Sequence, residues 1–119
     1  MMQIYHNSRC GKSRKAIQYF ADRHFVVEVI EYLKNPTSRE TLTDIIIKSG
    51  LKVKDFIRTK ESLYQERFAD QTHNDSEWIE IIVDNPILLE RPIIVTDKKA
   101  WIARSDEMLE QISLMLKKS

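Results

Sequence analysis

The stretch MQIYHNSRCGKSRKAIQYFADRHFVVEVIEY, residues 2–32, decides the fold class of this chain. Residues 2–6 alternate and carry β-favouring side chains, so they predict a short strand. An apolar face at helical spacing predicts a helix over residues 11–23, and the β-branched residues 25–32 predict a second strand. A strand, a helix and a strand within about 30 residues form a βαβ unit, whose two strands lie parallel.

The middle of the chain predicts helices rather than strands. The motif Thr37-Ser-Arg-Glu40 is typical of a capping box, and Gly50 is a typical stop for the helix that follows it. Residues 53–58 predict a short helical piece, whereas residues 59–74 are polar and predict no defined element. A second cap motif, Asn74-Asp-Ser-Glu77, opens another predicted helix.

The C-terminal part of the chain predicts a β-hairpin and a final helix. Residues 92–96 and 100–103 predict two strands joined by a turn at Asp97-Lys98. Ser105 is a typical N-cap for the final helix. The predicted order is therefore βαβ, a helical middle and ββα, which places the chain in the α/β class.

Length and composition predict one ordinary globular domain. The chain has 119 residues, 42% of them hydrophobic and 31% charged, and we expect residues 1–119 to form a single domain. The formal net charge of +1 gives no general attraction to nucleic acid. No apolar run approaches the roughly 20 residues that span a bilayer, and no signal-peptide pattern is present. With a single cysteine the chain forms no internal disulfide, so we expect it in the reducing cytoplasm.

Cys10 is the first candidate for chemistry. It falls where the predicted strand gives way to the predicted helix, and the amides of a helix N-terminus favour a thiolate or a bound anion. Its neighbours Arg9, Lys12 and Arg14 add positive charge. A buried structural cysteine is the common alternative, but core cysteines rarely sit in so polar and basic a string. We therefore expect a reactive Cys10, with a pKa below that of a free thiol.

The string Cys10-Gly-Lys-Ser13 is a Cys-x-x-Cys arrangement in which serine replaces the second thiol. A dithiol exchange inside the chain is impossible, so any disulfide at Cys10 involves an outside thiol. The Ser13 hydroxyl can donate a hydrogen bond that stabilises the thiolate. The alternative is a helix-start serine with no catalytic task, and the sequence leaves both interpretations open.

The predicted hairpin brings two arginines face to face. With the turn at Asp97-Lys98, Thr96 pairs with Lys99, and the numbers of paired residues sum to 195. Arg91 then lies opposite Arg104 at the open end of the hairpin. Two like charges across a ladder are destabilising unless an anion lies between them. The alternative is a pair of solvated arginines that splay apart.

Three motifs resemble one known family. His6-Asn7-x-Arg9-Cys10-x-x-Ser13-Arg14 is similar to the active-site string of the glutaredoxin-dependent, ArsC-type arsenate reductases. Arg91-Pro92-Ile93 resembles their Arg-Pro-Ile motif, and Ala103-Arg104-Ser105 resembles their late arginine before the last helix. The resemblance runs the length of the chain and keeps the order and spacing of the motifs.

The resemblance implies a thioredoxin-like fold with a small mixed four-stranded sheet and an inserted helical segment. It implies that Cys10 is the nucleophile, that His6 and Ser13 support the thiolate, and that Pro92 is cis and faces the cysteine loop. It also implies that three arginines, Arg58, Arg91 and Arg104, hold the arsenate oxygens. For Arg58, the alternative interpretation is a plain surface residue. The predicted substrate-binding residues are Arg14, Arg58, Arg91, Pro92 and Arg104.

The implied reaction begins when the Cys10 thiolate attacks arsenic(V) while guanidinium groups neutralise the oxyanion. Glutathione is the implied co-substrate: the arsenic is reduced as a Cys10–glutathione mixed disulfide forms, and glutaredoxin restores the thiolate. We therefore expect arsenate or a similar oxyanion, glutathione and glutaredoxin as partners. We expect no bound cofactor, no metal, no nucleic acid and no membrane.

Other functions share parts of this pattern. A glutathione-dependent thiol oxidoreductase of the same fold would use Cys10 on a different substrate. An Spx-like transcriptional regulator would bind RNA polymerase, but such relatives typically sense redox state through Cys-x-x-Cys, which Ser13 interrupts here. A monothiol glutaredoxin holding an iron–sulfur cluster would not need Arg58, Arg91 and Arg104.

Overall fold

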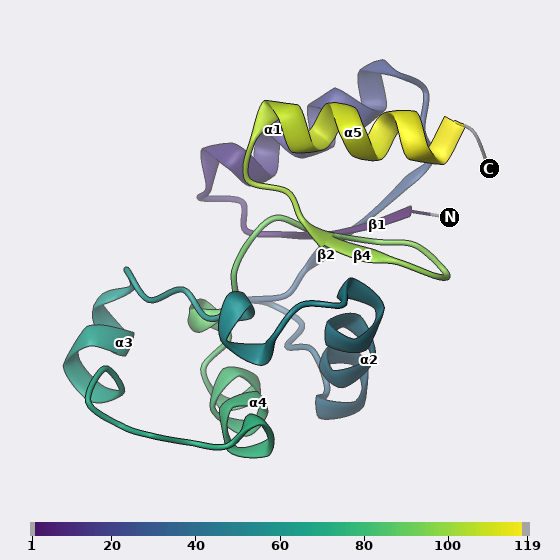
Figure 1. Ribbon diagram of the computed structural model, residues 1–119. Helices are drawn as coiled ribbons and strands as arrows, with labels where there is room; N and C mark the ends of the chain where they lie inside the picture. Colours follow the sequence, from purple (N-terminus) through teal and green to yellow (C-terminus); the bar gives the residue numbers. More distant parts are fainter. Residues whose placement is uncertain (1, 118–119) are drawn as a thin grey trace. The chain divides into compact units, whose positions relative to one another are not determined.

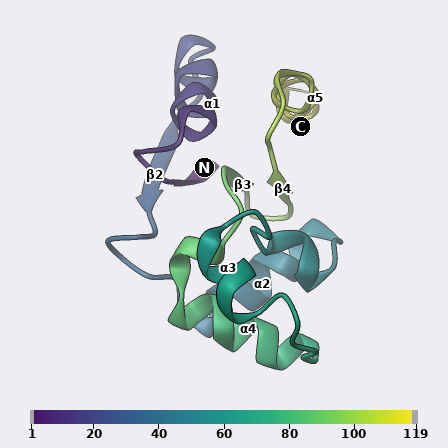
Figure 2. The same cartoon turned by 90° about the vertical axis from the view of Figure 1, so that its left-hand side faces the viewer.

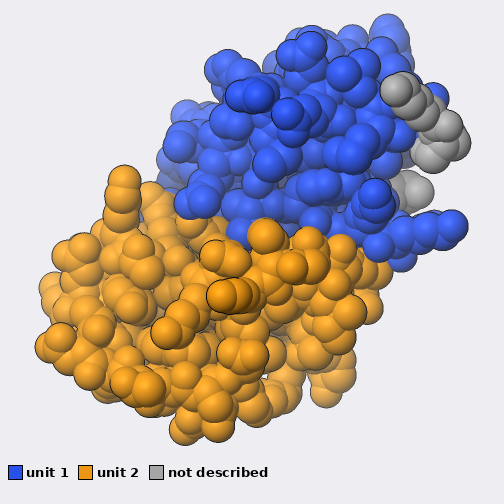
Figure 3. Space-filling view, in the orientation of Figure 1, with its two compact units in different colours: residues 1–31, 91–119 blue, residues 32–90 orange. Residues whose placement is uncertain are grey.

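The computed structural model describes residues 2–117 of the chain. The chain divides into two compact units, one made of residues 1–31 and 91–119 and the other of residues 32–90 (Figure 3). The single domain that the sequence predicts for residues 1–119 stays a prediction. Within the described residues, the structure has no helix both long enough and apolar enough to cross a membrane.

The first unit contains a mixed four-stranded sheet. Its strands are β1 (Met2–His6), β2 (Val27–Glu31), β3 (Ile93–Val95) and β4 (Ala100–Ile102), in the order β2-β1-β3-β4. β1 pairs in parallel with β2 and antiparallel with β3, and β3 pairs antiparallel with β4. The parallel βαβ pair and the four-stranded mixed sheet that the sequence predicts are both confirmed.

Two helices cover one face of this sheet, α1 (Gly11–Asp22) and α5 (Asp106–Lys117) (Figures 1 and 2). Because side chains alternate along a strand, Met2 and Ile4 point to the same face. A cluster of buried side chains joins that face to both helices: Met2, Ile4, Ala16, Phe20, Ile94, Ala103, Leu109 and Ile112. Cys10 lies at the edge of this layer, between the end of β1 and the start of α1.

The hairpin has the register that the sequence predicts. Val95 pairs with Ala100, Ile93 pairs with Ile102, and the Thr96 N–H donates a hydrogen bond of 2.8 Å to the Lys99 carbonyl oxygen. The strands are shorter than the predicted residues 92–96 and 100–103, although the Ala103 N–H still donates to the Pro92 carbonyl oxygen at 3.0 Å. The ladder ends before Arg91 and Arg104, so their predicted position opposite each other stays a prediction.

The second unit is helical. It contains α2 (Arg39–Ser49), α3 (Ser62–Arg67) and α4 (Asp75–Asp84), together with the 3₁₀ segments η1 (Val53–Phe56) and η2 (Pro86–Leu88). The sequence of α3, SLYQER, carries no apolar stripe, and none of its residues is buried. Because an apolar stripe is the main signal for a helix, residues 59–74 predicted no element.

The helix caps of the second unit follow the predicted chemistry with one shift. The predicted box at Asn74 and Glu77 is confirmed, and Gly50 ends α2 with φ 69°. The cap of α2 is Ser38 rather than Thr37, because the Ser38 Oγ accepts the hydrogen bond from the Thr41 N–H at 3.2 Å. Serine and threonine are both good N-caps, so the sequence alone does not separate neighbours of this kind.

Candidate active site

Cys10 is the N-cap of α1, at the end of the loop that follows β1. Its N–H donates to the Asn7 carbonyl oxygen at 2.9 Å, and its own carbonyl oxygen accepts the Arg14 N–H at 3.1 Å. The first bond closes the loop and the second starts the helix. The side chain is partly exposed, so the thiol stays accessible at a helix N-terminus.

Two buried polar residues hold the loop around Cys10. Ser13 is fully buried and Asn7 is nearly so, and the Asn7 N–H donates to the Ser13 Oγ at 3.5 Å. The Asn7 Oδ1 accepts the Arg9 N–H at 3.0 Å. Asn7 was not among the predicted site residues. Its signal was available, because an asparagine that bonds the backbone two residues on is typical of an Asx turn.

The pKa of Cys10 lies below the value of a free thiol, in the direction that the sequence predicts. Burial is the largest influence and raises this pKa, but hydrogen bonds to the sulfur outweigh it. They come from the Ser13 N–H, the Arg91 side chain, the Ser13 hydroxyl and the Lys12 N–H, in decreasing order. Ser13 thus acts on the sulfur twice, through its backbone and through its hydroxyl.

Arg91 is the arginine that the structure brings to Cys10. Its side chain lies near enough to lower the pKa of Cys10, and its Nε and Nη1 are buried and have no hydrogen-bond partner among residues 2–117. A buried charged donor without an acceptor costs free energy unless an anion supplies one. The Arg91–Pro92 peptide bond is cis, as the resemblance implies. The Cys10 thiol and the two unpartnered donors of the Arg91 guanidinium therefore belong to one site.

His6 is buried on the helix-covered face of β1, the face that also carries Met2 and Ile4. Its Nδ1 has no hydrogen-bond partner within the described residues, and its neighbour in the parallel register is Glu31. Burial lowers the pKa of His6 most, Glu31 raises it and Arg14 lowers it, with a net lowering. Burial of His6 therefore favours its neutral form.

Arg14 and Arg104 are two further predicted substrate-binding residues of this unit. The Arg14 Nη1 donates to the Ser8 carbonyl oxygen at 2.7 Å, so this side chain reaches back over the loop. Arg104 is exposed, and with Lys12 and Lys15 it lines a cavity of about 270 Å³ beside the first turn of α1. The Lys15 ammonium pairs with Asp106 at 2.8 Å, which leaves the cavity with a positive balance.

Arg58 belongs to the other compact unit. Its N–H donates to the Leu88 carbonyl oxygen at 2.7 Å, and its Nε lies 3.9 Å from the Glu61 carboxylate. The neighbouring residue Ile57 forms an isolated antiparallel bridge with Leu89, which ties this segment down within its own unit. The role of Arg58 in holding the oxyanion stays a prediction.

The structure thus brings Ser13 and Arg91 near enough to Cys10 to lower its pKa, with His6 at the end of β1 and Arg14 in α1 on either side of the same loop. Among residues 2–117, no group of three or more His, Cys, Asp or Glu side chains is placed to hold a metal ion. The arrangement suits nucleophilic attack by a thiolate on an electrophile that carries oxyanion groups.

Comparison with known proteins places this chain in a family. The model of the ArsC family matches residues 5–112, a range that contains every predicted site residue. The chain is 38% identical to Escherichia coli YfgD, over 93% of this chain and 95% of that protein. It is 37% identical to an arsenate reductase of Neisseria meningitidis, over 93% of this chain and 97% of that protein.

A solved structure shows that the similarity extends to three dimensions. The arsenate reductase from Vibrio cholerae superposes with a TM-score of 0.86 at 33% identity. The match covers 93% of this chain and 96% of that chain.

Proposed function

Because this chain belongs to the ArsC family and has its thioredoxin-like fold, we propose that it is an arsenate reductase with Cys10 as nucleophile and with glutathione and glutaredoxin as reductants. The observation that carries the proposal is the pair of buried, unpartnered donors of Arg91 beside a thiol of lowered pKa. A thiol oxidoreductase acting on disulfides needs the thiolate but not those donors. An oxyanion substrate needs both.

The first step is formation of a sulfur–arsenic bond. The Cys10 thiolate attacks arsenic(V), and an arsenate oxygen leaves as water after it is protonated. The Arg91 guanidinium donates to the remaining oxygens and neutralises their charge, which stabilises the adduct. The N–H groups of Lys12 and Ser13, which stabilise the thiolate before attack, lie beside the same centre.

The second step moves two electrons to arsenic. Glutathione joins the adduct, and its sulfur forms a disulfide with the sulfur of Cys10. Two thiolate sulfurs are oxidised to one disulfide, while arsenic(V) becomes arsenic(III) and leaves as arsenite. The products are therefore arsenite and a Cys10–glutathione mixed disulfide, and the electrons balance.

The third step restores the thiol from outside. Ser13 stands where a second thiol would resolve the mixed disulfide, and Cys10 is the only cysteine of the chain. The reductant must therefore be an external thiol, and glutaredoxin is specialised for glutathione mixed disulfides. The chain itself contributes an exposed approach to the sulfur, because Ser8, Arg9 and Gly11 around it are exposed.

The test is arsenate-dependent oxidation of NADPH, coupled through glutathione reductase, glutathione and glutaredoxin. We expect turnover that requires arsenate and glutaredoxin and that is abolished by Cys10→Ala. Thioredoxin and its reductase in place of the glutathione system should give no turnover. Failure with both systems, with Cys10 still reactive toward iodoacetamide, would overturn the arsenate assignment and favour the disulfide oxidoreductase.

A further inference from the structure

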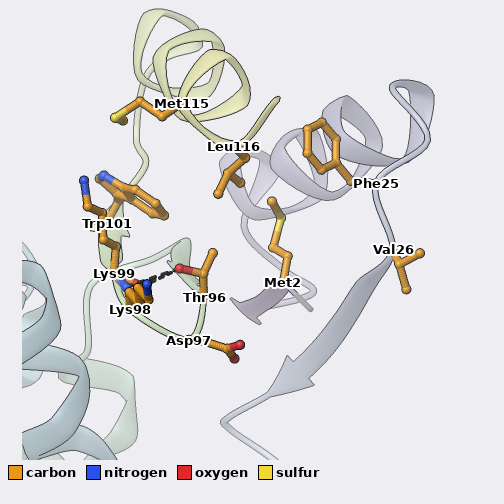
Figure 4. Close-up of a pocket in the computed structure, with 10 residues that line it drawn as sticks. All are labelled: Met2, Phe25, Val26, Thr96, Asp97, Lys98, Lys99, Trp101, Met115 and Leu116. Carbon is orange, nitrogen blue, oxygen red and sulfur yellow. Dashed lines mark hydrogen bonds between the residues drawn. The ribbon is translucent and has the colours of Figure 1, made fainter. Parts of the chain in front are cut away.

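A second cavity lies in the same unit as Cys10 but at the other end of the sheet. It has a volume of about 550 Å³ and opens near Met2, where β1 begins (Figure 4). Cys10 follows the opposite end of β1, beyond His6. A strand rises by about 3.3 Å per residue, so the length of β1 separates the two places. The cavity therefore has no part in the Cys10 chemistry.

The walls of this cavity are mainly apolar. Phe25, Trp101 and Leu116 line it and are only partly buried, and all three pack against the helix–sheet core. At the rim, Val26 is 73% exposed and Met115 is 41% exposed. Figure 4 shows Trp101 on one side and Met2, Leu116 and Phe25 on the other. The core of this unit is thus open to solvent here. Apolar side chains on both walls can contact a ligand.

The polar side of the cavity is the turn of the β3–β4 hairpin. Its residues Asp97, Lys98 and Lys99 are exposed and line the cavity. The Thr96 N–H and hydroxyl both donate to the Lys99 carbonyl oxygen, at 2.8 and 3.3 Å, so the turn is held in place. Within residues 2–117, no ion pair engages any of these three side chains. The turn thus brings two ammonium groups and one carboxylate to the cavity.

We propose that this cavity binds a medium-length alkyl carboxylate, with the alkyl chain between Trp101 and Leu116 and the carboxylate at Lys98 and Lys99. The volume lies within the range of about 300–1,000 Å³ that is common for small-molecule sites, which are mostly apolar with a few placed polar groups. The apolar walls reward burial of methylene groups, and the excess of positive charge selects the anionic head group. Flexible methionines such as Met2 and Met115 adapt to chains of different shape.

The experiment is an NMR titration of the ¹⁵N-labelled full chain with decanoate below its micelle concentration. We expect saturable shifts in the amides of residues 96–101 and 115–116, with the amides of residues 7–13 unmoved. Decyltrimethylammonium, which has the same chain length and the opposite charge, should bind more weakly. Equal binding of both probes would overturn the proposal, as would shifts that do not saturate.

Two variants test the two halves of the cavity. Replacing both rim lysines (Lys98→Gln with Lys99→Gln) should weaken decanoate binding by roughly two- to fivefold, the effect of losing an exposed ion pair. The matched control, Lys54→Gln with Lys60→Gln, removes two exposed lysines from the other unit and should leave binding unchanged. Met115→Asp should weaken binding further, because it places a carboxylate at the apolar rim.

A second copy of this chain is the competing occupant. If the same amides shift with protein concentration in the absence of decanoate, and Met115→Asp abolishes that shift, the surface is an interface between copies and the proposal is wrong. Identical decanoate affinities for the rim-lysine variant and its control would equally contradict a carboxylate site.

Discussion

The Arg14 Nη1 donates a hydrogen bond of 2.7 Å to the carbonyl oxygen of Ser8. The bond spans six residues and ties the first turns of α1 to the loop before the cysteine. The Asn7 Oδ1 holds the Arg9 N–H from the other side, so the backbone on both sides of Ser8 is fixed. Arg14 therefore has a task in loop geometry, and its predicted role in substrate binding stays a prediction.

Arg14→Ala should loosen the cysteine loop without unfolding the protein. We expect the amides of Arg9 and Cys10 to exchange with deuterium roughly three- to tenfold faster, the equivalent of losing one hydrogen bond. Arg23→Ala is the matched control, because the Arg23 Nη1 donates to the Tyr19 carbonyl oxygen at the other end of α1, at 3.1 Å. Equal acceleration of the loop amides in both variants would contradict a local role for Arg14.

Arg91→Met should raise the pKa of Cys10, because it removes a hydrogen bond to the sulfur. The measurement is the pH profile of Cys10 alkylation by iodoacetamide. We also expect kcat/KM for arsenate to fall roughly 10- to 100-fold, as for the loss of a charged hydrogen bond.

Arg104→Met separates the two expected effects of Arg91, which are to lower the pKa of Cys10 and to bind the oxyanion. The main hydrogen bonds that lower the pKa of Cys10 come from Ser13, Arg91 and Lys12, so Arg104→Met should shift the alkylation profile less than Arg91→Met while it lowers kcat/KM for arsenate. An alkylation profile that moves equally in both variants would mean that general positive charge, rather than the Arg91 contact, lowers this pKa.

Ser13→Ala should also raise the pKa of Cys10, because the hydroxyl bond to the sulfur is lost while the Ser13 N–H remains. We expect alkylation at neutral pH to slow by roughly three- to tenfold, the equivalent of one hydrogen bond. Ser113→Ala tests for an unspecific effect, since Ser113 is another buried serine in the same unit, on α5. An unchanged rate in Ser13→Ala would leave Ser13 as a helix-start serine only.

His6 should make the protein less stable in mild acid. Burial holds the pKa of His6 below 6.5 in the folded state, so the unfolded chain binds the proton more readily. This contribution to stability is complete above the unfolded value of 6.5 and is lost as pH falls through the lower folded value. His6→Gln should therefore lose less stability than the natural chain between pH 7.5 and 5.5.

Urea unfolding at the two pH values measures this difference. His24→Asn is the matched control, because His24 is exposed and has a φ of 65°, a conformation that asparagine tolerates. If His6→Gln and the natural chain lose stability in parallel, His6 is not the group that titrates.

The parts of the fold that local sequence determines were predictable. The turn at residues 97–98 sets the hairpin register because each pairing follows from the one before it, and Val95 indeed pairs with Ala100. The cap at Asn74 was readable because a side-chain oxygen and its N–H target lie only three residues apart. Cys10 at the N-terminus of α1 follows from the same kind of short-range pattern.

The site was predictable only in part, since some of its contacts are made by residues far apart in the chain. Glu31 is the neighbour of His6 because β1 and β2 pair in parallel with one particular register, and no local motif sets that register. The fall of the His6 pKa depends on burial, which the sequence around His6 does not reveal. Asn7 was within reach of sequence reasoning, because its hydrogen bond to the Arg9 N–H is local.

By itself, then, the sequence determined the order of the elements, the hairpin register and the position of Cys10 at a helix start, because each depends on residues a few positions apart. Only the tertiary structure decided that Arg91, eighty-one positions after Cys10 (91 − 10), lies where it lowers the pKa of that thiol, with its Nε and Nη1 buried and unpartnered among the described residues. The reason is physical: burial and long-range hydrogen bonds arise when the sheet brings β3 beside β1, and no short stretch of the chain carries that information.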